Sequence, residues 1–144
     1  MITRIETSGS AALVALVALV TLAAASAVAQ DAGGRTLRDG VYTDARAAAG
    51  KKVYDAQCAS CHEGGSMGPG LKGDDFLTTW ENKTLRVLST RIQETMPADA
   101  PGTLQEQELL DLVAYLVRAN GFASGTTGFS TPADLDTITI VRAK

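Results

Sequence analysis

Apolar residues recur at helical spacing in three stretches, which predicts a chain of helices joined by polar loops. The clearest stretch is 104–119, where one stripe of apolar side chains would face a core: Leu109, Leu112, Val113 and Leu116. Thr103 and Glu106 have the spacing of a capping box at its start, and Gly121 follows where a helix is expected to end.

The other helical stretches are shorter or looser. Residues 84–95 place three apolar side chains on one face: Leu85, Leu88 and Ile92. This helix is expected to end at Met96, because Pro97 disfavours helical geometry in the residue before it. Residues 44–57 keep roughly helical spacing, and 74–81 have the length of a short helix.

The remaining segments are polar and rich in glycine. Residues 30–43 have no sustained period, so we expect a flexible lead-in to a domain spanning 44–121. Residues 63–73 contain five glycines and a proline, which predicts a loop. Residues 122–144 are expected to form an extended C-terminal tail, with a short strand or wrap at its isoleucine-rich end.

The first 29 residues hold a continuous apolar run, AALVALVALVTLAAA, followed by small residues. Ala27-Val28-Ala29 fits the pattern of a signal-peptidase site, which predicts a secretory signal peptide over 1–29, cleaved after Ala29, and a periplasmic protein. The stretch from Ala11 is also as long as a membrane-spanning helix, which needs about 17–25 residues. An uncleaved membrane anchor is therefore the alternative, and only in that case is the protein membrane-bound.

Composition and charge narrow the function classes. The net charge is −3 and the pI is about 5.1, which argues against nucleic acid as a partner. Hydrophobic residues make up 45% of the chain, but the N-terminal run holds a large share of them, and aromatic residues are only 5%. A domain so short of core material often needs a disulfide, a metal or a cofactor.

Both cysteines and the only histidine lie together in the pentapeptide CASCH at 58–62. A disulfide between Cys58 and Cys61 is one interpretation, but so short a loop restrains little of the unfolded chain. A thioredoxin-like redox pair belongs at a strand-to-helix junction, whereas here a predicted helix precedes the motif and a glycine-rich loop follows. Structural zinc requires four Cys or His ligands, and the chain has three.

Covalent attachment of a c-type haem accounts for all three side chains of the motif. Cys58 and Cys61 would form thioethers with the haem vinyl groups, and His62 would be an axial ligand of the iron. The haem would also supply core material that the composition lacks. Of the four interpretations we favour this one, with one covalently bound haem c.

The opposite axial position needs a second ligand, and the chain has two methionines besides the initiator. Met67 lies five residues after His62 in the glycine-rich loop, so we expect it to stay on the histidine side. Met96 lies 34 residues after His62, beyond a predicted helix, and can approach the opposite face. We predict Met96 as the ligand; Met67 as the ligand and Met96 as an ordinary core residue are the alternatives.

Over roughly residues 44–121 the chain resembles the class I c-type cytochromes. Gly50, Tyr54 and Cys58 reproduce the family's Gly-x-x-x-aromatic-x-x-x-Cys spacing on its first helix, and LVAYL at 112–116 resembles the Leu-x-x-Tyr-Leu of its last helix. The resemblance implies an all-α class I cytochrome c fold, with three to five helices wrapped around the haem. It also implies that the first and last helices cross closely at the glycine, with the two tyrosines around the contact.

The loop GPGL at 68–71 resembles the family's Gly-Pro-x-Leu loop. The resemblance implies that the carbonyl of Pro69 accepts a hydrogen bond from the second nitrogen of His62, and that Leu71 touches the haem face. Trp80 departs from a strict alignment with the family. Its indole N–H is expected to reach a haem propionate, with an ordinary core position as the alternative.

More narrowly, the segment 96–122 resembles small cytochromes that serve bacterial quinoprotein dehydrogenases. It begins with Met96 followed by proline, like the family's distal methionine motif. The tails of those cytochromes also continue past the last helix into a Pro-Ala-Asp segment and an isoleucine-rich end. This resemblance implies a quinoprotein dehydrogenase as a partner, with a terminal oxidase or another cytochrome downstream.

The functional expectation is electron transfer rather than catalysis. The sole histidine is committed to the iron and the carboxylates are scattered, so the sequence contains no catalytic constellation. With His62 and Met96 both on the iron, no position is open to substrate, and the haem can only change oxidation state. The protein is therefore expected to carry single electrons, and the cytochrome subunit of a dehydrogenase is one form that this role would take. The alternative is a haem-based sensor or peroxidase-like enzyme in which Met96 is labile.

Overall fold

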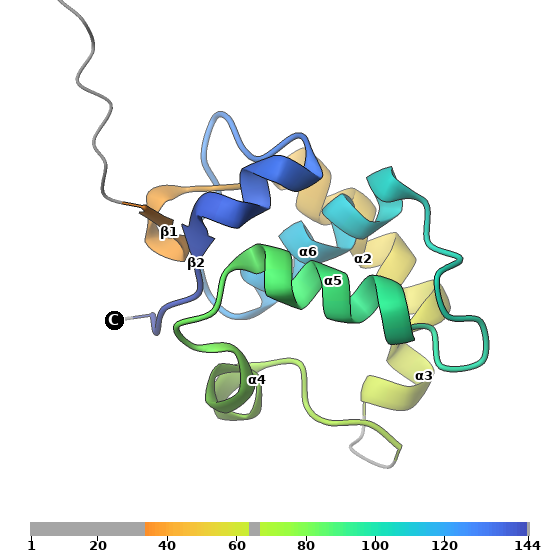
Figure 1. Ribbon diagram of the computed structural model, residues 1–144. Helices are drawn as coiled ribbons and strands as arrows, with labels where there is room; N and C mark the ends of the chain where they lie inside the picture. Colours follow the sequence, from red (N-terminus) through yellow and green to blue (C-terminus); the bar gives the residue numbers. More distant parts are fainter. Residues whose placement is uncertain (1–33, 64–66, 144) are drawn as a thin grey trace, which may run out of the picture. The chain divides into compact units, whose positions relative to one another are not determined.

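The computed structural model describes residues 34–63 and 67–143, so the predicted signal peptide at 1–29 lies outside the described residues. The chain folds mainly into helices (Figure 1): α2 (Asp44–Gln57), α3 (Ala59–His62), α4 (Gly73–Trp80), α5 (Leu85–Thr95) and α6 (Glu106–Ala119). Two short strands, β1 (Arg35–Thr36) and β2 (Ile138–Thr139), pair in parallel. Two 3₁₀ helices flank the strands, η1 (Leu37–Asp39) and η2 (Pro132–Thr137). This architecture confirms the expected all-α fold.

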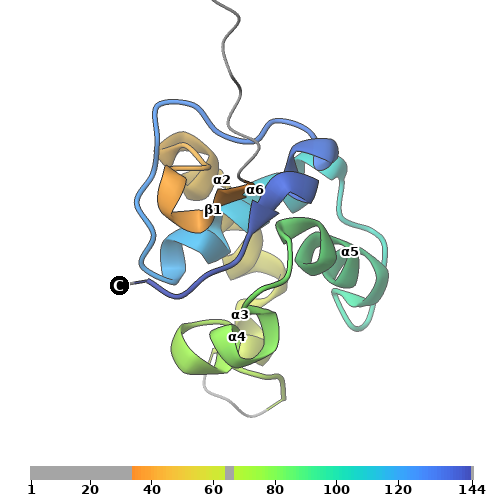
Figure 2. The same ribbon diagram turned by 60° about the vertical axis from the view of Figure 1, so that its left-hand side comes forward.

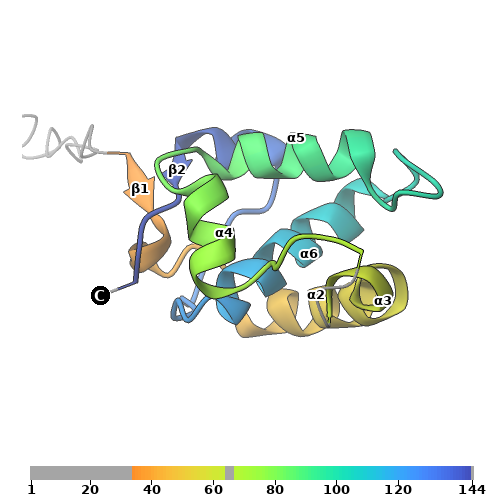
Figure 3. The ribbon, with the colours of Figure 1, turned by 90° about the horizontal axis from the view of Figure 1, so that it is seen from below.

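Helices α2 and α6 cross closely, as Figure 3 shows from below. A Cβ atom at Gly50 would overlap the carbonyl oxygen of Asp111 on α6, so the crossing requires glycine at this position. Beside it, the rings of Tyr54 and Tyr115 lie 4.9 Å apart between centroids at an interplanar angle of 45°. The close crossing expected at the glycine and both tyrosines is present.

Replacing Gly50 with leucine should destabilise the folded protein by about 1–3 kcal/mol, at the upper end of that range. The added side chain meets backbone atoms of Asp111 and Leu112, which can move only if the whole helix α6 moves. The measurement is urea unfolding of the haem-bound protein. Ala48→Leu is the control, because Ala48 is exposed on the same helix. An unfolding free energy that is the same in both variants would contradict the tight crossing.

Helix α6 lies at the centre of the hydrophobic core. Eight consecutive or near-consecutive residues of this helix are buried: Leu109, Leu110, Leu112, Val113, Ala114, Tyr115, Leu116 and Val117. The helix begins two residues later than predicted, and Glu108 rather than Glu106 closes its first turn by accepting the N–H of Gln105 at 2.9 Å. Thr103 instead donates its hydroxyl to the carbonyl of Ala100.

Among the described residues, none of the helices combines the length and the hydrophobicity that a membrane-spanning helix needs.

The segments before α2 and after α6 differ from the sequence expectation, because both contribute side chains to the core. Figure 2 shows the course of the two segments alongside the helices, in orange and dark blue. In the described part of the expected flexible lead-in, Leu37, Val41 and Tyr42 are fully or almost fully buried. The Tyr42 hydroxyl donates to the carbonyl of Phe122 at 2.6 Å, which joins the two segments. The expected flexible lead-in over 30–43 is therefore wrong for residues 34–43.

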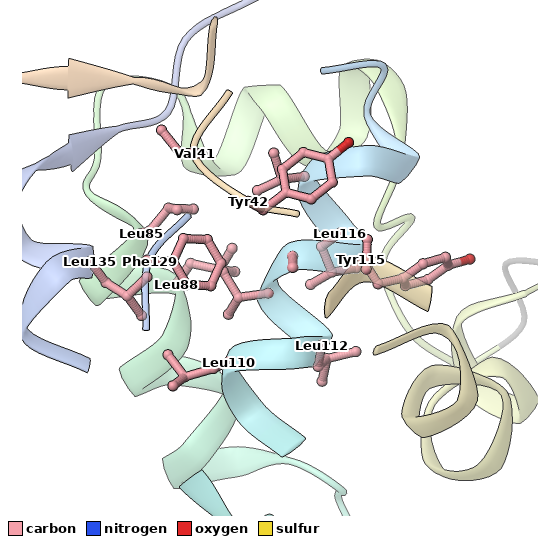
Figure 4. Packing of buried hydrophobic residues seen from close by; sticks show 14 of the residues in the cluster. Val41, Tyr42, Leu85, Leu88, Leu110, Leu112, Tyr115, Leu116, Phe129 and Leu135 are labelled. Carbon is pink, nitrogen blue, oxygen red and sulfur yellow. The ribbon is translucent and has the colours of Figure 1, made fainter. Parts of the chain in front are cut away.

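The expected extended tail is likewise packed for most of its length. Figure 4 shows Phe129 and Leu135 beside Leu85 and Leu88 of α5. The turn into η2 is fixed by Asp134, whose carboxylate accepts the backbone N–H groups of residues 130 and 131 at 2.7 and 2.8 Å. These backbone hydrogen bonds lower the pKa of Asp134 to about 2.

The C-terminal end of the chain also holds helix α4 in place. Ile140 exchanges two backbone hydrogen bonds with the turn that follows α4, accepting from Asn82 and donating to Lys83. Arg142 forms ion pairs of 3.0 Å with Asp74 near the start of α4 and with Glu81 just after its end. The tail therefore positions the segment that carries Trp80.

Candidate haem site

One turn of the chain gathers the three side chains of the CASCH motif. Cys58 lies between α2 and α3 and caps both helices, and its N–H donates to the carbonyl of Tyr54 at 2.9 Å. The carbonyl of Cys58 accepts the N–H groups of Cys61 and His62 at 3.1 and 3.0 Å. Both cysteines are free and half-buried, so their sulfur atoms are available for bonds to a ligand.

The environment of Cys58 does not favour thiol chemistry. Burial raises the pKa of the Cys58 thiol, and the neighbouring Cys61 raises it further. Thiol–disulfide enzymes have the opposite arrangement, in which a lowered pKa maintains a reactive thiolate. The thioredoxin-like alternative therefore gains no support from the electrostatics of the motif.

The imidazole of His62 is oriented by the loop that follows it. Nδ1 of His62 lies 2.9 Å from the carbonyl oxygen of Pro69. Because a carbonyl oxygen only accepts, Nδ1 is the donor in this contact, so a metal would bind the other ring nitrogen, Nε2. This is the arrangement usual for a metal-bound histidine, in which the second nitrogen donates to a carbonyl or carboxylate.

Gly68 allows the loop to approach the imidazole. A Cβ atom at this position would lie 2.7 Å from Cε1 and 2.9 Å from Nδ1 of His62, closer than real Cβ contacts. The glycine therefore lets the backbone lie against the ring and brings Pro69 into hydrogen-bonding distance. The role of His62 as an axial ligand remains a prediction.

Asn120 anchors the next part of the same loop, and the sequence analysis did not identify it. Its Nδ2 donates to the carbonyls of Leu71 and Leu116, at 3.1 and 2.9 Å, while its Oδ1 accepts the N–H of Gly73 at 2.9 Å. The loop is thereby fastened to the end of α6. The only sequence signal was an asparagine just before a helix-terminating glycine.

A cavity of about 260 Å³ lies beside the imidazole. It is lined by Tyr54, His62, Glu63, Gly70, Leu71 and Lys72. Lys72 and Glu63 form an ion pair of 3.5 Å at this edge. Burial, with a smaller contribution from Glu63, raises the pKa of Tyr54 to about 12, so its hydroxyl stays protonated.

The two methionines differ sharply in environment. Met96 ends α5, where its N–H donates to the carbonyl of Ile92 at 2.8 Å, and its half-buried side chain packs against the hydrophobic core. Met67 is 73% exposed. Trp80, the last residue of α4, is half-buried, and the ammonium of Lys83 lies 5.1 Å from its ring centroid. The roles of Met96 and Trp80 toward a cofactor remain predictions.

The residues present fit a covalently bound haem. The donor set comprises two free thiols, an imidazole with Nε2 left for a metal, and a thioether at the end of α5. Four large apolar side chains that follow the motif in sequence are covered only in part by the protein: Leu71, Leu77, Trp80 and Met96, the last of which is also the thioether donor. A flat apolar group bound through the cysteines would bury such surface.

Comparison with known proteins agrees with this assignment. Residues 45–116, half of the chain, match the family described as cytochrome c oxidase, cbb3-type, subunit III. The chain is 33% identical to cytochrome c-555 of Chlorobaculum tepidum over 82 residues, which is 49% of this chain and 74% of the relative. It is 34% identical to cytochrome c-555 of Prosthecochloris aestuarii over 83 residues, which is 47% of this chain and 82% of the relative. No solved structure matches the chain significantly.

Proposed function

The chain belongs to the class I c-type cytochromes, and from this premise we propose that it carries single electrons in the periplasm between a dehydrogenase and a downstream acceptor. That it is a mono-haem electron carrier follows from the family and the paired cysteines Cys58 and Cys61. The observation that carries the proposal furthest is the hydrogen bond from Nδ1 of His62 to Pro69. It leaves Nε2 to bind a metal, and His62 directly follows Cys61 in the sequence.

The chain's own residues would hold the cofactor in defined roles. Cys58 and Cys61 would hold the haem through two thioethers, and His62 and Met96 would bind its iron. The bound haem supplies a one-electron couple between ferrous and ferric iron, and methionine ligation raises its reduction potential. With both side chains on the iron, His62 and Met96 would exclude substrate from it and would restrict the chemistry to electron transfer.

Pro69 and Leu71 support this arrangement from the histidine side. The Pro69 carbonyl keeps the proton on Nδ1, fixes the orientation of the ring and increases its basicity toward the iron. Leu71 is half-buried next to the imidazole, where it would cover the haem face from water. Trp80 would reach a haem propionate through its indole N–H.

We propose a quinoprotein dehydrogenase as the electron donor and a terminal oxidase or another cytochrome as the acceptor. The donor is supported by the resemblance of 96–122 to cytochromes that serve such dehydrogenases. An oxidase acceptor is in keeping with the family description, which names an oxidase subunit. Export through a signal peptide over 1–29, cleaved after Ala29, would place the protein in the compartment where such partners meet.

Absorption spectra of the protein expressed with export to the periplasm test the electron-carrier function. The reduced protein should show the sharp bands of a six-coordinate c-type haem and should not change when carbon monoxide is added, because both axial positions are occupied. Carbon monoxide binding by the unmodified protein would instead favour the sensor or peroxidase-like alternative. A colourless protein would favour thiol chemistry.

A further inference from the structure

The segment between α5 and α6 starts at Met96 and returns to the core at Leu104. Its first residue is fixed to α5, because the N–H of Met96 donates to the carbonyl of Ile92. The N–H of Ala100 then donates to the carbonyl of Pro97 at 3.0 Å, which forms a turn. At its far end, Leu104 is 4% exposed. We call residues 96–104 the methionine loop.

Gln93 joins the far end of the methionine loop to α5. Its side-chain Nε2 donates to the carbonyls of Gly102 and Leu104, each at 3.3 Å. Gly102 has a φ of +78°, a conformation that suits glycine and turns its carbonyl into this contact. The loop is therefore held to the same helix at both ends, by the backbone of Ile92 and by the amide of Gln93.

The amide of Gln93 acts through its nitrogen alone. Its Oε1 is buried and has no hydrogen-bond donor within the described residues. A buried acceptor without a partner destabilises the folded state, so Oε1 gives no reason for a glutamine at position 93. The two donated hydrogen bonds are what the side chain contributes at this site.

We propose that Gln93 is a positioning residue for the axial methionine, because it closes the methionine loop and so keeps the Met96 thioether at the iron. The proposal rests on the proposed function, in which Met96 is the second ligand. Gln93 lies three residues before Met96, in the last turn of α5, and the chain leaves the helix in extended conformation at Met96. Without the two hydrogen bonds the loop is fixed at one end only, and the thioether leaves the iron more often.

The test uses the haem-bound protein with Gln93→Met, which keeps the length of the side chain and removes both donors. Gln93→Glu is the second variant, because its carboxylate faces the same two carbonyls without an N–H. Gln107→Met is the matched control, since Gln107 is exposed in the first turns of α6, where its Nε2 donates to the side chain of Asp111. We measure the rate at which imidazole binds the oxidised protein, the sulfur-to-iron charge-transfer band, and hydrogen exchange of the Ala100 amide.

Both Gln93 variants should bind imidazole about tenfold faster than the unmodified protein, as expected from the loss of two hydrogen bonds. Ala100 should exchange faster in both, whereas Gln107→Met should change neither rate. Unchanged imidazole binding in the Gln93 variants, or an equal increase in Gln107→Met, would overturn the positioning role. If the unmodified protein lacks the charge-transfer band, Met96 is not the ligand and the proposed function fails in this respect. The role of Gln93 in holding the loop is tested separately, by the exchange rate of the Ala100 amide.

Discussion

Replacing both Cys58 and Cys61 with alanine should remove all covalently bound haem and leave the domain largely unfolded. The two sulfur atoms are the proposed attachment points, so neither a thioether nor a retained haem is expected in the double variant. Without haem, four large apolar side chains lose the group expected to cover them: Leu71, Leu77, Trp80 and Met96. The measurements are haem retained after acid–acetone extraction and the helical circular dichroism signal.

Single variants and a neighbouring residue provide the controls for this prediction. Cys58→Ala and Cys61→Ala should each retain part of the haem through the remaining thioether. Ser60→Ala should retain all of it, because Ser60 is exposed between the two cysteines. Covalent haem in the double variant would show that attachment does not depend on this motif.

The helices could be predicted from sequence because their buried side chains recur at the period of the helix. The expected ranges 44–57 and 84–95 differ from the observed α2 and α5 by at most one residue at either end. In both helices, the spacing of buried side chains follows the helical turn. The start of α6 was placed less accurately, since the choice between Thr103 and Gln105 as cap depends on contacts of single side chains.

The segments at both ends of the domain were not predicted, because their burial depends on partners far away in sequence. Tyr42 is buried against Phe122, 80 positions later, and the glycine-rich composition around both gives no period. Leu37 and Leu135 are fully buried within segments whose composition is typical of loops. An isolated apolar residue in such a segment carries no information about its partner.

The site shows the same division between local and long-range information. The grouping of Cys58 and His62 is contiguous in sequence, and the contact with Pro69 was expected only through the family resemblance. The two side-chain amides that hold the site's loops, those of Gln93 and Asn120, were missed. Both bind backbone carbonyls, and a carbonyl is offered by every residue type, so no sequence pattern marks the acceptor.

Replacing Met96 with alanine should change the iron's coordination without removing the haem. The oxidised protein should lose its sulfur-to-iron charge-transfer band, because Met96 is the proposed source of the sulfur. Its reduction potential should fall by on the order of 0.1 V or more, since a thioether favours ferrous over ferric iron. The reduced variant should also bind carbon monoxide at the freed position. Optical titration, voltammetry and a carbon monoxide difference spectrum measure the three effects.

Met67→Ala is the matched control, because Met67 is 73% exposed in the loop on the histidine side and its loss should change none of the three properties. Loss of the band in Met67→Ala, with the band kept in Met96→Ala, would reverse the ligand assignment and contradict the proposed role of the methionine loop. If neither variant loses the band, or the unmodified protein never shows it, the iron is not ligated by methionine. An open coordination position would then favour a sensor or peroxidase-like function over electron transfer, because a ligand or peroxide would have direct access to the iron opposite His62.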